Sequence, residues 1–287
     1  MKFKIKPEVF QKFPNLVVGL PIILGFDNQK SGSEILKYLR QQEKDSQARM
    51  KPDELFKDKR VASYLELFKQ FGADPAKIVP THVALVKRVL EGGQIPDINP
   101  LVNLYNAVSI KYLTPFGGED LDTLYGDFVL KFSPGGEQWI GIGAKKNKPT
   151  IKGDLVWGDN LDISTKSLNW RQCERTKLTA ESKDGYFIMD GFADINRANI
   201  DQAAQEFMEL AVKWCGGKAE IHWLDKKHSE AEVDFKTKNV KSVKPVVSVK
   251  KIKIKPNVEK IEDGLYKVNP PNAEGNKGEE FELNGEE

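Results

Sequence analysis

The 287-residue sequence has few cysteines and histidines, which narrows the chemistry available to it. Cys173 and Cys215 are the only cysteines, too few for a disulfide framework, and their number fits a reducing compartment. The three histidines are far apart in the sequence and no CxxC or HExxH spacing occurs, so we expect no metal site. Its paired glycines match neither a P-loop nor a dinucleotide fingerprint, and we expect no cofactor.

The sequence also lacks an apolar run of the roughly 20 residues that a membrane span needs. The longest candidate, residues 16–26, is interrupted by Gly19, Pro21 and Gly25. The N-terminus alternates lysines with apolar residues and has no signal-peptide apolar segment behind it. We therefore expect a cytoplasmic protein that has no membrane partner.

Neither positive nor negative side chains are in large excess. Lys and Arg number 44 and Asp and Glu number 42, which gives a formal net charge of +2. Such a chain has no global electrostatic field that would attract nucleic acid, and we expect no DNA partner. A surface for RNA therefore has to be a local patch, and the oligomeric state is left open.

Apolar periodicity predicts initial strands, then four helices, then a β-rich segment that contains one more helix. The expected helices span about residues 33–49, 61–71, 81–90, 99–112 and 200–214. The expected strands span about residues 3–5, 16–24 (as one or two strands), 128–132, 139–142, 155–157, 186–189 and 219–224. Thr81 is a plausible helix cap, and Asn99 followed by Pro100 is a clearer helix start, because proline at the first position has no amide to leave unpaired. This order predicts an α+β fold.

The composition changes near residue 226. Beyond it there are few large apolar residues and many lysines, and residues 236–255 contain no acidic residue. Such a segment cannot bury enough apolar surface to offset the entropy of ordering. We expect a domain at residues 1–225 and a charged, low-complexity, largely disordered tail at 226–287, in which residues 247–254 could form a strand. The lysines of this tail could contact RNA phosphates or serve only solubility.

A first candidate site places Gly117 and Gly118 directly before the carboxylates of Glu119, Asp120 and Asp122. Glycines let a backbone approach a ligand closely, and a buried carboxylate can orient water or bind an amine. The alternative is a turn followed by the acidic N-terminus of a helix, where the helix dipole favours negative charge. Spacing alone favours the alternative.

A second candidate segment, residues 169–177, combines Trp170 with the cations Arg171, Arg175 and Lys177. This combination suits stacking on a base together with contacts to phosphates. The alternative is a solvated strand edge with one buried tryptophan, and the pattern alone favours it.

Two further features carry open interpretations. Asn99, Asn103 and Asn106 form a polar stripe on one expected helix, and their amides could line a pocket or hydrogen-bond the neighbouring backbone. Cys173 has no histidine near it in sequence, so the pattern does not favour a catalytic thiol.

Several separated motifs together resemble a known family, the stand-alone B3/B4 domain proteins. These proteins are similar to the tRNA-binding and editing module of the phenylalanyl-tRNA synthetase beta subunit. The motifs are Phe-Gly-Ala at residues 71–73, Val-Leu-Glu-Gly-Gly at 89–93, Ile-Pro at 95–96, Ile-Asn-Pro-Leu-Val-Asn-Leu-Tyr-Asn-Ala-Val-Ser at 98–109, Gly-Gly-Glu-Asp-Leu-Asp at 117–122, and Asn-Trp-Arg-Gln at 169–172 followed by Thr176 and Thr179. The resemblance covers roughly residues 1–225.

The resemblance implies a β-sandwich-like core flanked by helices, and a pocket that accepts the 3′ end of a mischarged tRNA and hydrolyses its ester. It implies tRNA as partner and no synthetase activity, since no adenylate-forming domain is present. The histidine that synthetase members carry near the Gly-acidic loop is absent from residues 117–124. The implied residues are Glu119 and Asp120 as catalytic groups, Asn106, Gly117, Gly118, Asn169 and Thr176 in the pocket, and Trp170, Arg171, Arg175 and Lys177 on the RNA.

Three functions follow as hypotheses. The first is a trans-acting hydrolase of misacylated tRNA. The second is a non-catalytic module that binds RNA or tRNA. The third is an enzyme or binder for a small amino-acid-like ligand, which the near-neutral net charge keeps open. They differ in whether Asn106, Glu119 and residues 169–176 converge on one cavity, and in whether turnover occurs.

Overall fold

A computed structural model of the chain describes residues 1–74, 76–238, 258–262 and 265–268. The chain divides into two units, Met1–Val243 and Lys244–Glu287. The helices of the first unit are α1 (Pro7–Lys12), α2 (Gly32–Arg49), α3 (Lys59–Gln70), α4 (Thr81–Leu90), α5 (Pro100–Tyr112) and α6 (Arg197–Cys215), with 3-10 turns at Pro52–Lys57 and Leu121–Thr123. Its strands are β1 (Lys2–Ile5), β2 (Leu16–Leu24), β3 (Gly117–Asp120), β4 (Phe128–Phe132), β5 (Leu155–Gly158), β6 (Ile163–Lys166), β7 (Arg171–Gln172), β8 (Asp184–Phe192), β9 (Lys218–Leu224) and β10 (Glu230–Glu232).

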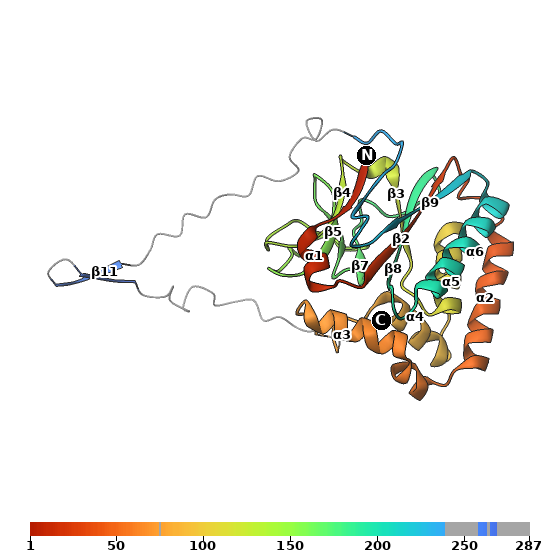
Figure 1. Cartoon of the computed structure of the whole chain (residues 1–287), viewed down its shortest axis with the longest axis horizontal. Helices are drawn as coiled ribbons and strands as arrows, with labels where there is room; N and C mark the ends of the chain where they lie inside the picture. The colour runs from red at the N-terminus through yellow and green to blue at the C-terminus, as the bar shows by residue number, and fades with distance from the viewer. Residues whose placement is uncertain (75, 239–257, 263–264, 269–287) are drawn as a thin grey trace. The chain divides into compact units, whose positions relative to one another are not determined.

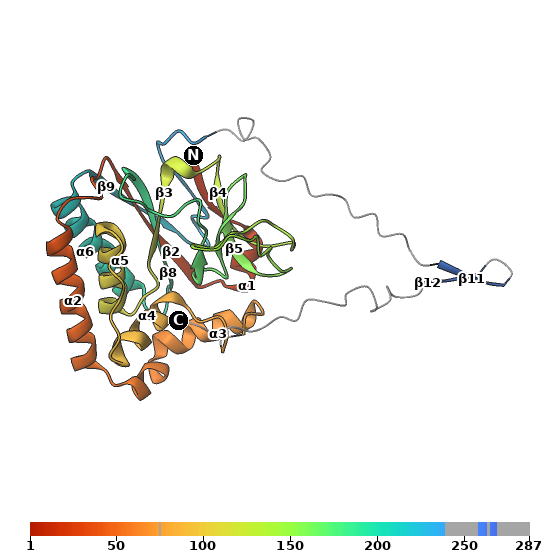
Figure 2. The same cartoon turned by 180° about the vertical axis from the view of Figure 1, so that it is seen from behind.

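These strands form two sheets that pack with helices. One sheet has six strands in the order β10-β1-β4-β5-β6-β7, and the other has four antiparallel strands in the order β3-β8-β2-β9. The four-stranded sheet lies between the six-stranded sheet and the helices α5 and α6, with α2 packed on α5 (Figures 1 and 2). The expected fold, a mixed α+β core of two sheets flanked by helices, is confirmed.

Strand β2 is buried on both faces, which explains its uninterrupted apolar sequence. Leu16, Val18, Leu20 and Ile22 point into the core between the two sheets. The residues between them point the other way, and Val17 and Ile23 pack against α5 and α6. Because side chains alternate between the faces of a strand, only a strand covered on both sides is apolar at nearly every position.

Helix α5 begins where the Asn-Pro pair predicts. The Asn99 side chain accepts a hydrogen bond from Val102 N at 3.1 Å, which satisfies one of the unpaired amides of the first turn. Asn99 Oδ1 also accepts from Asn28 Nδ2 at 3.0 Å, and Asn28 Oδ1 accepts from Leu101 N at 2.9 Å. This buried amide pair ties the start of α5 to the segment after β2.

The three asparagines of the stripe therefore differ in what they bind: two hold the start of α5 and one does not. Asn103 Oδ1 accepts from Ile98 N at 3.0 Å and its amide donates to Asp97 at 2.6 Å, so this side chain holds the approach to the helix. Asn99 is the cap. Asn106 is buried, but its side chain makes no hydrogen bond to another described residue.

Several expected local structures are wrong. Residues 139–142 form only an isolated antiparallel bridge, between Gly141 and Cys173, and no strand. The pairing does not extend to Trp139, because Trp139 N donates to Asn147 Oδ1 and Trp139 O accepts from Lys148 N within the same loop. Pro7 follows β1, as expected, but it is also the first residue of a short helix, α1, that was not expected. Thr81 does not cap α4, because its hydroxyl donates to the main-chain oxygens of residues 169 and 170 instead.

The folded body extends past residue 225. Strand β10 pairs with β1, and the Met1 ammonium group donates to Val233 O at 2.9 Å and Phe235 O at 3.1 Å. The structure therefore moves the expected boundary toward the C-terminus. Further on, β11 (Val258–Glu262) and β12 (Leu265–Val268) pair as an antiparallel hairpin. The strand expected at residues 247–254 lies outside the described residues.

None of the helices in the described ranges is both long enough and apolar enough to cross a membrane.

Replacing Asn99 by alanine tests the cap. We expect the free energy of unfolding to fall by about 1–2 kcal/mol, because an N-cap bond is lost and the buried Asn28 amide loses a partner. Chemical denaturation measures this loss. Asn106→Ala is the matched control on the same helix and should cost less, since that side chain makes no hydrogen bond to the described protein. Equal losses would contradict the assigned roles.

Candidate functional site

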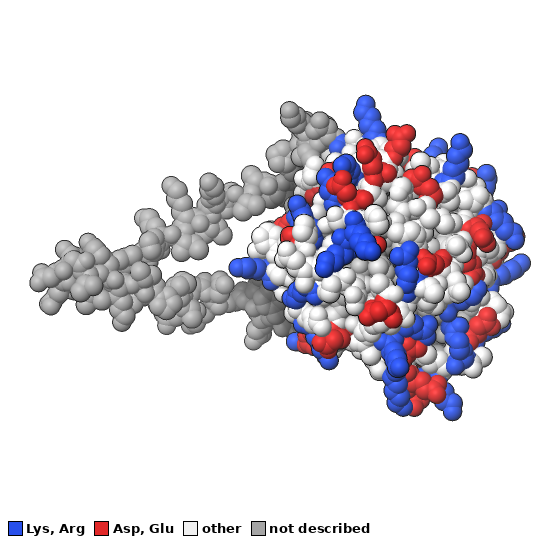
Figure 3. All heavy atoms as spheres, viewed as in Figure 1, with Lys and Arg blue, Asp and Glu red and all other residues white. Residues whose placement is uncertain are grey.

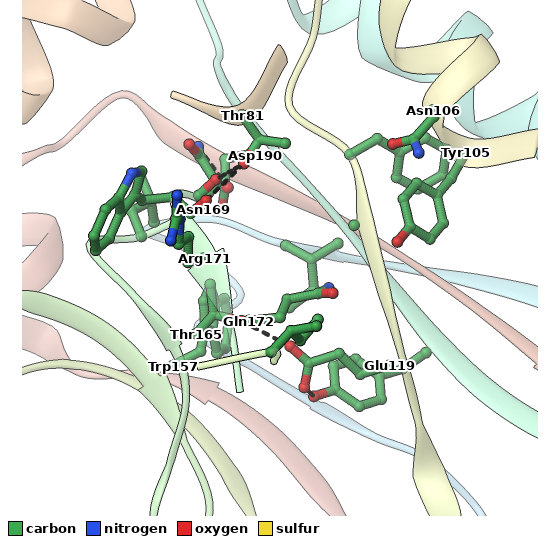
Figure 4. A pocket seen from close by; sticks show the side chains of 17 residues that line it. Thr81, Tyr105, Asn106, Glu119, Trp157, Thr165, Asn169, Arg171, Gln172 and Asp190 are labelled. Atoms are coloured by element: carbon green, nitrogen blue, oxygen red, sulfur yellow. Dashed lines mark hydrogen bonds between the residues drawn. The ribbon is translucent and has the colours of Figure 1, made fainter. Parts of the chain in front are cut away.

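A cavity of about 290 Å³ lies where α5, β3, β8 and the segment around β7 meet (Figure 4). It joins residues that are far apart in the sequence. Of the residues expected at the site, those that line the cavity are Asn106, Gly117, Glu119, Asn169, Trp170 and Arg171. Both candidate segments and the third asparagine of the α5 stripe thus converge on one place.

Glu119 is held at the cavity by hydroxyl groups. Its carboxylate accepts hydrogen bonds from Thr165 Oγ1 at 2.7 Å and from the hydroxyls of Ser164 and Tyr186. The side chain is only 2% exposed. Burial and then the nearby carboxylate raise the pKa of Tyr186 well above its usual value, so this phenol keeps its proton and donates it. The buried charge of Glu119 is therefore compensated by neutral donors.

Helix α5 supplies the wall opposite Thr165. Tyr105 and Asn106 both line the cavity, and Figure 4 shows them entering it from the helix. Burial, with a smaller contribution from Glu119, raises the pKa of Tyr105, so its hydroxyl stays protonated. The Asn106 amide has no hydrogen-bond partner among the described residues, which leaves its donors and acceptor for a ligand.

Glycine is required at the two positions before Glu119 for different reasons. A Cβ at Gly118 would lie 2.2 Å from Phe187 Cδ1, so packing against the strand β8 side chain requires glycine there. A Cβ at Gly117 would lie 3.0 Å from Gln172 Nε2, and this amide donates to Gly118 O at 3.1 Å. Gly117 thus allows β3 and the β7 segment to approach each other, and Gly118 allows β3 to pack on Phe187 of β8. Gly118 does not line the cavity.

Asp190 is a second carboxylate at the cavity, on β8. It is 1% exposed, and its Oδ2 accepts from Asn169 Nδ2 at 3.1 Å. Asp190 Oδ1 and Asn169 Oδ1 have no partner among the described residues. Burial raises the pKa of Asp190 from 3.8 to about 7, against the smaller opposing effect of the Asn169 bond.

The rim of the cavity is aromatic and cationic. The Arg171 guanidinium lies 5.1 Å from the centre of the Trp170 ring, and Trp170 is stacked with Trp139 at 6.3 Å between ring centres. Arg171 is exposed and forms no ion pair with any residue that the structure describes. Over the face in Figure 3, by contrast, basic and acidic side chains are interspersed.

The other cations of the 169–177 segment are not at the cavity. Arg175 forms ion pairs with Asp159, at 3.0 Å, and with Asp162, and it donates to Thr123 O at 2.6 Å. Burial by itself lowers the pKa of Arg175, but the hydrogen bond to Asp162 and the charges of Asp159 and Asp162 outweigh it and raise the pKa. Lys177 is paired with Glu174. Both charges are engaged within the protein.

Three more candidate residues lie behind the cavity wall. Asp120 accepts from Asp122 N at 2.9 Å and Ser182 Oγ at 2.5 Å, which makes it a cap of the 3-10 turn. Thr176 is fully buried and contacts Cys173 Sγ at 3.2 Å. Burial raises the pKa of the Cys173 thiol to about 11, so it is not a ready nucleophile at neutral pH.

Asp190, Tyr105, Gln172, Thr165 and Tyr186 line the cavity but were not expected from the sequence. The strand around Asp190 carried one usable signal, since a carboxylate inside an apolar strand needs a reason to be there. Tyr105 lies among apolar residues of α5, and its hydroxyl could not be assigned to a cavity without the tertiary structure. No cluster of three or more His, Cys, Asp or Glu side chains is suited to a metal ion within the described ranges.

The fold and the site define a mixed α+β domain with a small cavity of apolar walls and fixed polar groups. The B3/4 domain matches residues 63–216, more than half of the chain, and the protein belongs to the B3/4 domain family. The family expected from the motifs is confirmed. Among curated proteins, none matches this sequence.

Among solved structures, one similar chain is an N-terminal fragment of the phenylalanyl-tRNA synthetase beta-subunit from Pyrococcus horikoshii. The two chains are 14% identical with a TM-score of 0.35. The alignment covers 42% of this chain and 41% of the other, so this chain spans less than half of that fragment.

Asp190→Asn tests the burial of this carboxylate. A folded-state pKa raised from 3.8 to about 7 means that the native protein binds more protons than the unfolded chain, so stability falls as pH rises from about 4 to about 7 and then levels off. The neutral variant lacks this loss. We expect its free energy of unfolding, relative to wild type, to rise by a few kcal/mol between pH 4 and pH 8, at roughly 1.4 kcal/mol per pKa unit. Denaturation at both pH values measures the difference, and a pH-independent offset would contradict it.

Proposed function

We propose that this protein hydrolyses the ester bond of mischarged tRNA, with the amino acid in the cavity and the 3′ end of the tRNA on its rim. The observation that supports the proposal is the convergence of Asn106, Glu119 and the Trp170–Arg171 pair on one cavity. Membership of the B3/4 domain family is consistent with it.

The size and lining of the cavity suit an amino-acid side chain. A volume of about 290 Å³ is at the small end of ligand pockets, so a nucleotide would have to remain outside. Phe116, Trp157 and Ile188 offer apolar surface, while the Tyr105 hydroxyl and the Asn106 amide offer hydrogen bonds. A site with fixed buried polar groups discriminates strongly against ligands that leave those groups unpaired.

The rim suits the end of an RNA strand. Unpaired bases stack on aromatic rings, and arginine binds phosphate oxygens, so Trp170 would hold the terminal base and Arg171 a phosphate. Arg175 and Lys177 are engaged in ion pairs, so we leave them out of this proposed surface.

Glu119 would orient the attacking water. The oxygen of the water adds to the ester carbonyl carbon, and the bond from that carbon to the ribose oxygen breaks. The ribose oxygen takes a proton from the attacking water. The products are the free amino acid and tRNA with its terminal hydroxyl restored. The neighbouring ribose hydroxyl of the tRNA lies next to the ester in any bound pose. This chemistry needs no nucleophilic side chain, consistent with the buried thiol of Cys173.

Lysines beside the rim would extend the RNA contact. One loop carries three exposed lysines, Lys145, Lys146 and Lys148. The main chain of Trp139 holds this loop: its N–H donates to Asn147 Oδ1 and its oxygen accepts from Lys148 N, each at 2.9 Å. None of the three lysines pairs with a carboxylate in the part of the chain described. Trp139 stacks on Trp170, so this loop continues the cationic rim.

Deacylation of a panel of mischarged tRNAs tests the reaction. We expect at least one of them to be hydrolysed, and Glu119→Gln to slow the reaction by roughly 100-fold, because the oriented carboxylate is lost. Glu206→Gln is the matched control, since Glu206 also accepts hydroxyl bonds, from Tyr38 and Tyr112, but does not line the cavity. If the folded protein hydrolyses none of them, the hydrolase proposal is wrong, and salt-sensitive tRNA binding without turnover would favour the non-catalytic module.

The lysine loop is tested by the salt dependence of tRNA binding. Changing Lys145, Lys146 and Lys148 to alanine together should weaken binding and make the slope of log affinity against log salt shallower by about 0.7–0.9 per lost phosphate contact. The matched control changes the exposed Lys37, Lys44 and Lys59 to alanine, which removes the same charge from α2 and α3. Equal effects of the two triple variants would show that only net charge matters.

A further inference from the structure

One end of the cavity contains two oxygen acceptors that lack a donor. Asp190 Oδ1 and Asn169 Oδ1 have no hydrogen-bond partner among the described residues, and the two side chains are joined by the 3.1 Å bond between Asn169 Nδ2 and Asp190 Oδ2. The nearby Thr81 hydroxyl does not serve them, because it donates to the main-chain oxygens of Asn169 and Trp170. Figure 4 shows Thr81, Asn169 and Asp190 together on the side of the cavity where Arg171 lies.

The position of Asp190 is fixed from behind. Its main-chain oxygen accepts from the Tyr64 hydroxyl at 2.6 Å, and that hydroxyl is in turn bound by Asn196 Nδ2 at 3.0 Å. The main chain of Asp190 is therefore held in place, and its side chain is 1% exposed. A buried carboxylate in this state is costly unless a partner reaches it.

The protein supplies no cation to this carboxylate within the described ranges. Asp190 has no ion pair there; Tyr64 binds its main chain, and His82 lies against the Tyr64 ring at 4.6 Å between ring centres. Arg60, whose charge acts on Tyr64 and His82, is paired with Asp58 at 2.7 Å. Burial raises the pKa of Tyr64, so it stays a neutral phenol. Burial also lowers the pKa of His82 to about 3, so the imidazole is uncharged at neutral pH. Arg171, on the rim, lies 5.1 Å from the centre of the Trp170 ring and forms no ion pair with Asp190.

We propose that Asp190 and Asn169 bind the ammonium group of an α-amino acid in the cavity. An ammonium group has three donors and no acceptor, and this end of the cavity offers two buried acceptors that have no donor among the described residues. Its charge would compensate the carboxylate that the protein leaves unpaired. The inference rests on the proposed function only for the source of the amino acid, either esterified to tRNA or free.

This assignment separates the two carboxylates of the cavity. Asp190 takes the ammonium group, and Glu119, already bound by Thr165, Ser164 and Tyr186, is left for the water. The ammonium end would then lie near the rim residues Trp170 and Arg171, from which the tRNA end would enter. The side chain of the amino acid would extend toward the apolar walls.

Calorimetric titration with a panel of L-amino-acid amides tests the ammonium site, because an amide has an uncharged carbonyl like an ester but is not readily hydrolysed. We expect at least one amide to bind and its N-acetyl derivative, which lacks the ammonium charge, to bind at least tenfold more weakly. Asp190→Asn should weaken binding of the amide by at least tenfold, and Asn169→Ala should weaken it as well. At pH 6, binding of the amide should release protons to the buffer, because the cation favours the ionised form of Asp190.

The matched control is Asp154→Asn. Asp154 is likewise a buried carboxylate with one unpartnered oxygen, but it does not line the cavity. This variant should bind the amide like wild type. Equal binding of an amide and its N-acetyl derivative, unchanged binding by Asp190→Asn, or no binding by any amide would each overturn the ammonium site.

The same variants separate this inference from the proposed function. Deacylation of mischarged tRNA that Asp190→Asn leaves unchanged, with no Asp190-dependent amide binding, would overturn the ammonium site and leave the hydrolase standing. Asp190-dependent amide binding without any deacylation would do the reverse and leave a site for free amino acids.

Discussion

The carboxylate of Glu119 joins the two sheets of this protein. Glu119 lies on β3 and receives the Tyr186 hydroxyl from β8 of the same four-stranded sheet, while Ser164 and Thr165 donate from β6 of the six-stranded sheet. A carboxylate that is 2% exposed is tolerated only when donors replace the water it loses. The three hydroxyls therefore fix the spacing of the sheets at the cavity, and the cavity walls depend on that spacing.

Strand β8, which supplies Tyr186 to Glu119, also carries Asp190, a buried carboxylate that the protein compensates less fully. Tyr186, Ile188 and Asp190 face the cavity, while Phe187 and Met189 pack against the helices. Glu119 is satisfied by its neighbours, whereas Asp190 keeps an oxygen without a partner and a raised pKa. Glu119 pairs across the sheet with Tyr186, four residues from Asp190 on β8, so the two carboxylates lie in one cavity but differ in how far the protein compensates them.

Much of the fold followed from local rules in the sequence. The Asn99-Pro100 start of α5 was predictable because capping uses only neighbouring atoms, and β2 was predictable because nine residues without a charge have to be buried. Residues 139–142 were expected to be a strand because of their apolar composition, yet they make only one isolated bridge, from Gly141 to Cys173, because Trp139 bonds to Asn147 and Lys148 instead. Strand β10 was missed because a three-residue strand gains its stability from β1 rather than from its own composition.

The sequence by itself determined the class of the protein, the convergence of its motifs on the B3/4 family, and the presence of Glu119, Asn106, Trp170 and Arg171 among the candidates. Only the tertiary structure decided which charges were available. Arg171 and Arg175 are four residues apart and identical in chemistry, yet one lies on the rim and the other is held by Asp159 and Asp162. Burial and pairing are properties of what packs around a residue, and the segments that surround it here come from distant parts of the chain.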